Sequence, residues 1–147
     1  MRWPLLALGA ALLLAGCGGK DDPGRTPAGQ AQARFLDNLY HGRLGVAYAS
    51  LHPAYQRIVP RKRFVACTRK TDLGGLDSID ILEVHDDPVD IPGTGSVAAK
   101  AVRVRLTSSD GGATTFVNHE VEVGSQWRWV LNAAAAHAYQ AGRCPGG

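Results

Sequence analysis

The chain has 147 residues, of which 45% are hydrophobic and 20% charged, and its formal net charge is +3. This length accommodates one domain and leaves no room for two sizeable cores. The single long apolar run lies at the N-terminus, which excludes a protein that crosses the membrane several times. Basic and acidic residues are interspersed, so the weak positive charge does not indicate a nucleic-acid partner.

The first residues have the features of a secretory leader. Trp3 to Ala15 form an apolar run of 13 residues after a positive start, shorter than the roughly 20 residues that span a bilayer. The run ends in Leu14-Ala15-Gly16-Cys17, which resembles the lipobox of bacterial lipoproteins. The resemblance implies that residues 1–16 are a signal peptide and that acylated Cys17 binds the lipid bilayer at the extracytoplasmic face of the cell membrane. An ordinary signal peptide or an uncleaved anchor would also fit the apolar run.

The remaining chain divides into a tether and one domain. Residues 17–30 are rich in glycine, proline and charge, a composition that builds no packed element. We therefore interpret 17–30 as a flexible tether with a reach of about 20 Å and 31–147 as a single domain.

The cysteine count agrees with export. Apart from Cys17 the chain has only Cys67 and Cys144, an even pair that favours a disulfide outside the cytoplasm. Such a bridge would stabilise the fold by about 4–5 kcal/mol in the chain-entropy model, and the alternative is two free buried thiols. No spacing typical of metal ligands and no cofactor fingerprint is present, so we expect neither a metal nor a cofactor.

Several short helices are predicted between Ala31 and Thr68. Apolar residues recur at helical spacing, first in the stripe from Phe35 to Tyr40 and then from Leu44 to Leu51. Pro53 and Pro60 each suit the first position of a further short helix.

The second half predicts long antiparallel strands. After Gly75 the apolar period changes to two, with a bend near Ile81, a loop from Asp86 to Gly95 and a hairpin turn at residues 110–112. The strands end near Leu131, and Asn132 is suited to cap an alanine-rich helix over 133–140. The predicted class is α+β, with N-terminal helices packed on a curved, cone-like sheet of three to four long strands.

Two segments resemble nuclear transport factor 2-like (NTF2-like) domains, the cystatin-type cone family. Residues 35–39 and 45–51 are similar to the family's opening helices, and Gly-Ser-Gln-Trp-Arg-Trp-Val-Leu at 124–131 is similar to its final strand. The resemblance implies a cone with a tryptophan packed inside it. The tail that carries Cys144 departs from the family pattern, and the fold does not decide the function.

Candidate site residues fall into three groups. His119 alternates with Val117 and Val121, which predicts a ring facing the core, as a structural histidine, a ligand contact or a catalytic base. Aromatic side chains that could line a cone pocket, or simply form core, are Tyr40, Tyr48, Trp127 and Trp129. A basic surface, or an ordinary solvated helix face, is formed by Arg57, Arg61, Lys62 and Arg63.

We expect a membrane-anchored binding module for a small ligand or an envelope protein. The alternatives are a small isomerase- or cyclase-type enzyme that uses His119 in the cone, and a purely structural envelope domain. No nucleophile motif of a known hydrolase class is present, and no catalytic residue can be named.

Overall fold

The computed structural model describes residues 21–146, so the leader and Cys17 lie outside the described residues. The elements, in chain order, are η1 (Pro23–Arg25), α1 (Pro27–Tyr40), α2 (Leu44–Ala49), α3 (Pro53–Ile58), α4 (Arg61–Lys70), β1 (Leu76–Asp86), β2 (Val89–Ile91), β3 (Gly95–Val97), β4 (Lys100–Ser108), β5 (Ala113–Val123), β6 (Gln126–Trp129) and α5 (Ala133–Gln140).

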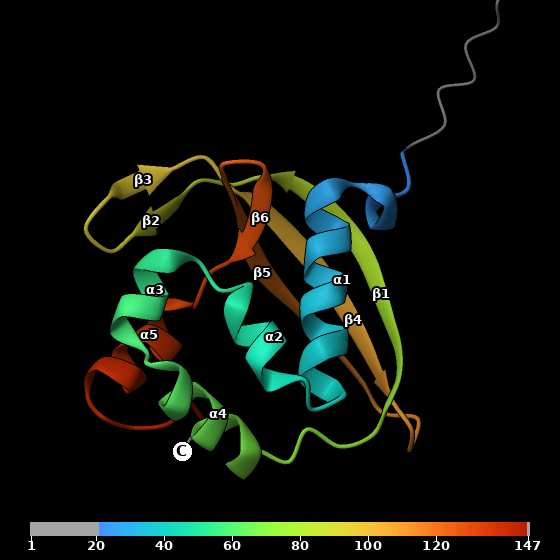
Figure 1. Ribbon diagram of the computed structural model, residues 1–147. Helices are drawn as coiled ribbons and strands as arrows, with labels where there is room; N and C mark the ends of the chain where they lie inside the picture. Colours follow the sequence, from blue (N-terminus) through green and yellow to red (C-terminus); the bar gives the residue numbers. More distant parts are fainter. Residues whose placement is uncertain (1–20, 147) are drawn as a thin grey trace, which may run out of the picture.

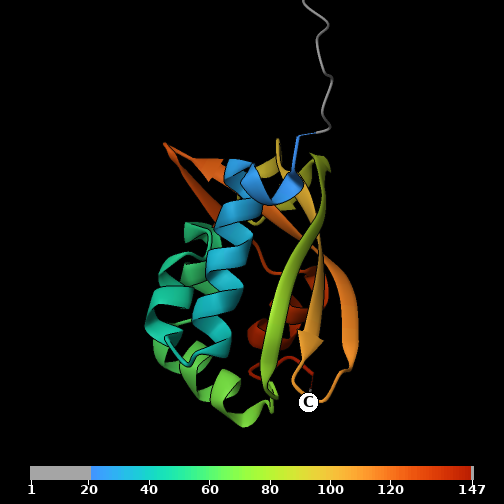
Figure 2. The same ribbon diagram turned by 90° about the vertical axis from the view of Figure 1, so that its right-hand side faces the viewer.

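Four strands form one antiparallel sheet in the order β1-β4-β5-β6 (Figure 1). The helices lie together on one side of it, with α1 packed against all four strands, as the turned view in Figure 2 shows. Val102, Val104 and Leu106 of β4 are buried in the core. The predicted α+β class, with helices on a curved antiparallel sheet, is confirmed.

The first helix begins earlier than the sequence predicted. The Thr26 side chain accepts a hydrogen bond from the Gly29 N–H (3.1 Å), and Pro27 stands in the first turn, so α1 starts at Pro27 and not at Ala31. η1 packs on this turn, since a Cβ at Gly29 would collide with the Pro23 carbonyl oxygen. The expected tether 17–30 is therefore wrong at its C-terminal end, where a cap and a proline start a helix that apolar periodicity alone does not reveal.

The expected bend in the first long strand is present. β1 has register irregularities between Leu76 and Ser78 and between Ile81 and Glu83, which increase the local twist of the strand. The loop expected from Asp86 to Gly95 is only partly a loop, because β2 and β3 form a small hairpin within it. Ile91 supplies the buried side chain of that hairpin.

The remaining boundaries follow local chemistry. Pro53 begins α3 as expected, whereas Pro60 is the N-cap of α4 and stands one residue before its first turn. Asn132 caps α5 by accepting a hydrogen bond from the Ala135 N–H (2.8 Å). No helix within the described residues is both long and apolar enough to cross a membrane.

Candidate functional site

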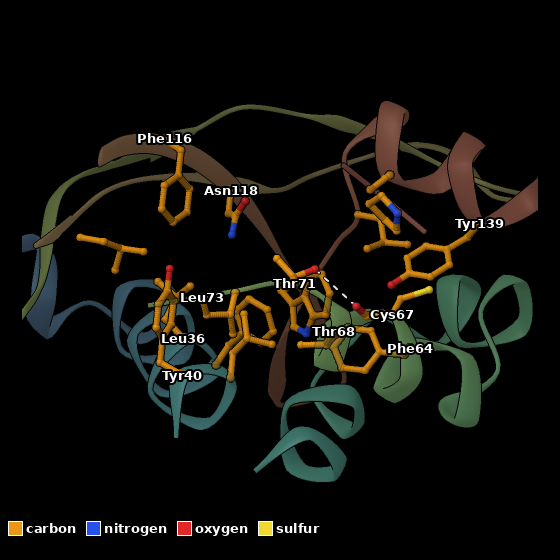
Figure 3. A pocket seen from close by; sticks show the side chains of 17 residues that line it. Leu36, Tyr40, Phe64, Cys67, Thr68, Thr71, Leu73, Phe116, Asn118 and Tyr139 are labelled. Carbon is orange, nitrogen blue, oxygen red and sulfur yellow. Dashed lines mark hydrogen bonds between the residues drawn. The ribbon is translucent and has the colours of Figure 1, made fainter. Parts of the chain in front are cut away.

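A cavity of about 370 Å³ lies between the helices and the sheet (Figure 3). Its walls come from α1, α4, β4, β5, β6, α5 and the C-terminal tail. The lining residues are Phe35, Leu36, Leu39, Tyr40, Phe64, Cys67, Thr68, Thr71, Leu73, Leu106, Phe116, Asn118, Trp129, Leu131, Ala135, Tyr139 and Pro145. None of them carries a charged side chain, so the cavity is suited to an uncharged ligand.

The helical wall follows directly from the apolar spacing in the sequence. Phe35, Leu36, Leu39 and Tyr40 stand on one face of α1 at i, i+1, i+4 and i+5, the spacing that forms a single stripe. The whole predicted stripe therefore borders the cavity, and its Phe35 and Leu36 also belong to the buried core.

Trp129 lies at the centre of an aromatic cluster in the wall. Its ring stacks on Phe35 with centroids 4.1 Å apart and lies 6.1 Å from Phe64. The indole N–H donates to the Ala47 carbonyl oxygen (3.2 Å), so the polar atom of this buried ring is satisfied. A tryptophan inside the cone was expected from the family resemblance, and the structure confirms it.

Few polar groups reach the cavity. The Asn118 amide points into it from β5 (Figure 3) and makes no hydrogen bond with another described residue. The Thr71 hydroxyl donates to the Cys67 carbonyl oxygen (3.3 Å). Burial raises the pKa of the Tyr40 and Tyr139 hydroxyls, with Arg63 partly opposing the effect at Tyr139, so both phenols stay protonated hydrogen-bonding groups. Asn118 is thus one polar group without a partner among the described residues that can orient a ligand, as are the Thr68, Tyr40 and Tyr139 hydroxyls.

A disulfide holds one wall of the cavity. The structure joins Cys67 of α4 to Cys144 of the tail, with Cα atoms 5.3 Å apart, as the sequence predicted. Cys67 and the neighbouring Pro145 both line the cavity. The bridge therefore keeps the C-terminal segment in place as part of the wall.

Only two of the four predicted pocket aromatics line this cavity. Tyr40 and Trp129 do so. Tyr48 packs against Phe64 instead (centroids 5.6 Å apart), and its hydroxyl donates to the Val59 carbonyl oxygen (2.8 Å). Trp127 lies at a separate depression beside the start of α1. Tyr48 is thus a core residue that fastens α2 to the end of α3.

The prediction that His119 faces the interior of the cone is wrong. The β4–β5 register pairs Val102 with Asn118 and Val104 with Phe116, and paired residues share a face of the sheet. Phe116 and Asn118 therefore face inward with the buried valines, whereas Val117 is 48% exposed. Val121 alternates with His119 and so lies on the same outer face of the strand, although its side chain is buried there.

The length of the β4–β5 hairpin loop decides which side chains of β5 face inward. Its closing pair is Thr107 and Ala113, so five residues lie between them. A turn of only Gly111 and Gly112 would have paired Asp110 with Ala113, a register shifted by three residues. Any shift by an odd number of residues exchanges the two faces of a strand, because successive side chains point to opposite sides.

His119 belongs to a second cleft, of about 350 Å³, beside the β2 hairpin strand and the start of α5. Its Nε2 lies 2.7 Å from Asp87 Oδ2, and the His119 side chain is 25% exposed. The same cleft is lined by Tyr55 and Asp90. The enzyme hypothesis with His119 in the cone therefore has no support in this geometry.

The interior contains two polar residues that sequence reasoning did not single out. Gln32 of α1 is 0% exposed and Glu120 of β5 is 1% exposed. Their four side-chain oxygen and nitrogen atoms have no hydrogen-bond partner among the described residues. Burial raises the pKa of Glu120 to about 8, with a smaller opposing effect from Arg34. Val102 and Val104 face inward on β4, and pairing β4 with β5 across a five-residue loop would have placed the Glu120 side chain on the same inner face.

The basic residues predicted on the helices lie mainly at the surface. Arg57, Arg61 and Lys62 are exposed, and Arg63 is half-buried with its Nε unpartnered among the described residues. No group of three or more potential metal ligands gathers anywhere in residues 21–146.

Comparison with protein-family models and with curated proteins finds no match for this chain. Among solved structures, the chain is similar to an NTF2-like protein from Campylobacter jejuni that is described, provisionally, as a transpeptidase. The TM-score is 0.50 at 15% sequence identity, over 70% of this chain and 96% of that one. Identity this low shows the fold alone, and the cone-like NTF2 fold predicted from the sequence is confirmed.

Proposed function

We propose that this NTF2-like domain belongs to an extracytoplasmic lipoprotein and that its cone binds a small, uncharged and largely apolar ligand. The observation that carries the proposal is the cavity between helices and sheet, whose lining contains no charged side chain. An open cavity of this kind would be unnecessary in a purely structural domain, where the same apolar side chains would fill the space.

The size and chemistry of the cavity define the ligand class. Its volume of about 370 Å³ lies in the lower range of small-molecule sites and equals the space of about a dozen waters. Aromatic and aliphatic walls favour a compact hydrocarbon body. The unpartnered Asn118 amide can both donate and accept, so it favours one hydroxyl or carbonyl on the ligand.

Export and anchoring rest on two further features. The Cys67–Cys144 disulfide fits an oxidising compartment. The lipobox-like Leu14-Ala15-Gly16-Cys17 lies outside the described residues and supports anchoring through its sequence alone. Together they support a protein held at the outer face of the cell membrane by acyl chains on Cys17.

Ligand binding is tested with the chain from Gly18 onward, secreted behind a cleavable signal and purified without detergent, since detergent would compete for an apolar site. The probe is N-phenyl-1-naphthylamine, an uncharged fluorophore whose emission rises in apolar surroundings. We expect saturable binding at one site per chain.

Two variants on one helix show whether the probe is in the cavity. Ala135 lines it and Ala134 of the same helix is exposed and does not. Ala135→Phe occupies part of the cavity and should weaken binding at least about tenfold, or roughly 1.4 kcal/mol, whereas Ala134→Phe should leave binding unchanged. No saturable binding, or equal binding by both variants, contradicts the proposal.

Anchoring is tested separately on the full-length chain in a bacterial host. The wild type should partition into the detergent phase, and its intact mass should lack residues 1–16 and include a diacylglyceryl group on Cys17. Cys17→Ser should show neither change in mass. A wild-type chain with an unmodified Cys17 would exclude the lipoprotein hypothesis and leave the cavity hypothesis untouched.

A further inference from the structure

The charges are separated between the two layers of the fold, although the sequence as a whole looks mixed. Residues 38–71, which form the end of α1 and the helices α2 to α4, contain seven lysines and arginines and no acidic residue. Residues 72–122, which form most of the sheet, contain ten acidic residues and three basic ones. The description of the charges as interspersed is therefore wrong for the helical layer.

Six cations of this layer and its adjoining tail are exposed and make no ion pair with any described residue: Arg57, Arg61, Lys62, Arg69, Lys70 and Arg143. We call them the basic helical face. The three cations of β4 behave differently, because Lys100, Arg103 and Arg105 pair with Asp86, Glu83 and Asp80. Unpaired like charges repel each other, so such a face favours an anionic partner.

The tail and α2 extend this face. The Cys67–Cys144 bridge fixes the neighbouring Arg143 beside α4. On the other side, the Arg61 guanidinium lies across Gly45 of α2, where a Cβ would collide with it. The next residue, Val46, is 55% exposed, the largest value among the exposed large hydrophobic residues of the described chain. An apolar side chain beside unpaired arginines is suited to the boundary between headgroups and acyl chains.

We propose that the basic helical face lies on the anionic lipid headgroups of the membrane that holds the anchor, and this inference rests on the anchoring part of the proposed function. Figure 2 shows the helices on the side of the molecule away from the sheet. The described chain begins beside η1, at the end of α1 that lies away from α4 (Figure 1). The five residue steps from Cys17 to Asp22 reach at most about 18 Å, so Cys17 and the basic helical face contact one bilayer when the long axis of α1 lies along the membrane surface.

The membrane is favoured over a soluble polyanion for two reasons. The anchor keeps the face at a high effective concentration near headgroups. The exposed Val46 also has no role in binding a soluble polymer of phosphates.

The test uses the chain from Gly18 onward, so that binding does not depend on lipidation. Its partition is measured by sedimentation with neutral phosphatidylcholine vesicles and with vesicles of which about a third is phosphatidylglycerol. We expect binding to the anionic vesicles only, decreasing as salt rises from about 50 to about 200 mM. Arg61→Gln/Lys62→Gln should weaken partition roughly 30-fold, from a factor of about five for each charge near the surface.

The matched control is Arg103→Gln/Arg105→Gln, which removes the same charge from the outer face of the sheet and should leave partition unchanged. Equal losses in both double variants would show an effect of net charge alone and overturn the proposal. Binding to soluble polyphosphate without binding to anionic vesicles would overturn it in favour of an acidic polymer. Neither outcome depends on Cys17 or on the cavity, so both are distinguishable from failure of the proposed function.

Discussion

Glu120→Gln is predicted to change how the stability of the fold depends on pH. Burial raises the pKa of this carboxyl from its ordinary 4.5 to about 8 in the folded chain. Between these values the unfolded chain has lost the proton and the folded chain still holds it. The unfolded state therefore binds fewer protons, and the free energy of unfolding falls as pH rises through this window.

The magnitude follows from the same two pKa values. Each pH unit costs about 1.4 kcal/mol, so the wild type should lose about 2 kcal/mol between about pH 6 and about pH 8 and approach a total loss of about 5 kcal/mol above that. Glutamine keeps the shape and cannot ionise, so Glu120→Gln should lack this slope and gain stability relative to the wild type as pH rises.

The assay is urea unfolding at several pH values, with Glu122→Gln as the control. Glu122 stands two residues further along the same strand but is exposed, and its variant should keep the wild-type slope. If Glu120→Gln and the wild type show the same pH slope, Glu120 does not carry a proton in the folded state and the inferred burial cost is wrong.

Three further substitutions test other parts of the fold and site. Cys67→Ser/Cys144→Ser removes a bridge across 77 residues and should lower the free energy of unfolding by about 4–5 kcal/mol, as measured by urea unfolding against the wild type with and without reductant. Gly29→Ala should lower the free energy of unfolding by about 1 kcal/mol, because the new methyl group meets the Pro23 carbonyl oxygen. If η1 did not pack there, the same change within a helix would raise the free energy of unfolding by up to about 1 kcal/mol. A urea midpoint that rises instead of falling would therefore contradict the packing of η1 on α1. In displacement of N-phenyl-1-naphthylamine, 1-naphthol should bind the wild type about fivefold more tightly than naphthalene, the value of one hydrogen bond to Asn118, and Asn118→Leu should abolish this preference.

Local signals in the sequence predict the elements well. The helical stripes, the strand-to-strand turns and the capped C-terminal helix all lie where periodicity and capping chemistry place them, because each depends on residues a few positions apart. The exceptions are the β2–β3 hairpin within the expected loop, Pro60 as the N-cap of α4, and the start of α1. Thr26 and Pro27 start the helix with polar and glycine-rich residues, so its first turn carries no apolar stripe.

The orientation of β5 is not a local property. Which of Asn118 and His119 faces the cone depends on how many residues the hairpin uses, and Asp110-Gly111-Gly112 is compatible with either parity. The pairing of Val102 with Asn118 settles the matter, because the valine side chain is fully buried and its partner must share that face. The inward-facing residues of β4 could have been used to assign the inward-facing residues of β5. This rule would have placed the side chains of Phe116, Asn118 and Glu120 inside.

The cavity itself has no signature in any single element, because it arises from a difference in strand length. β5 runs from Ala113 to Val123, but β6 pairs only with residues 120–123. Beyond Trp129 the chain leaves the sheet, and α5 with the disulfide-held tail covers the first half of β5 at a distance instead of pairing with it. Phe116 and Asn118 stand on that uncovered half and line the cavity. The short β6 therefore leaves the space beside this half of β5, and α5 with the tail closes it off as a cavity.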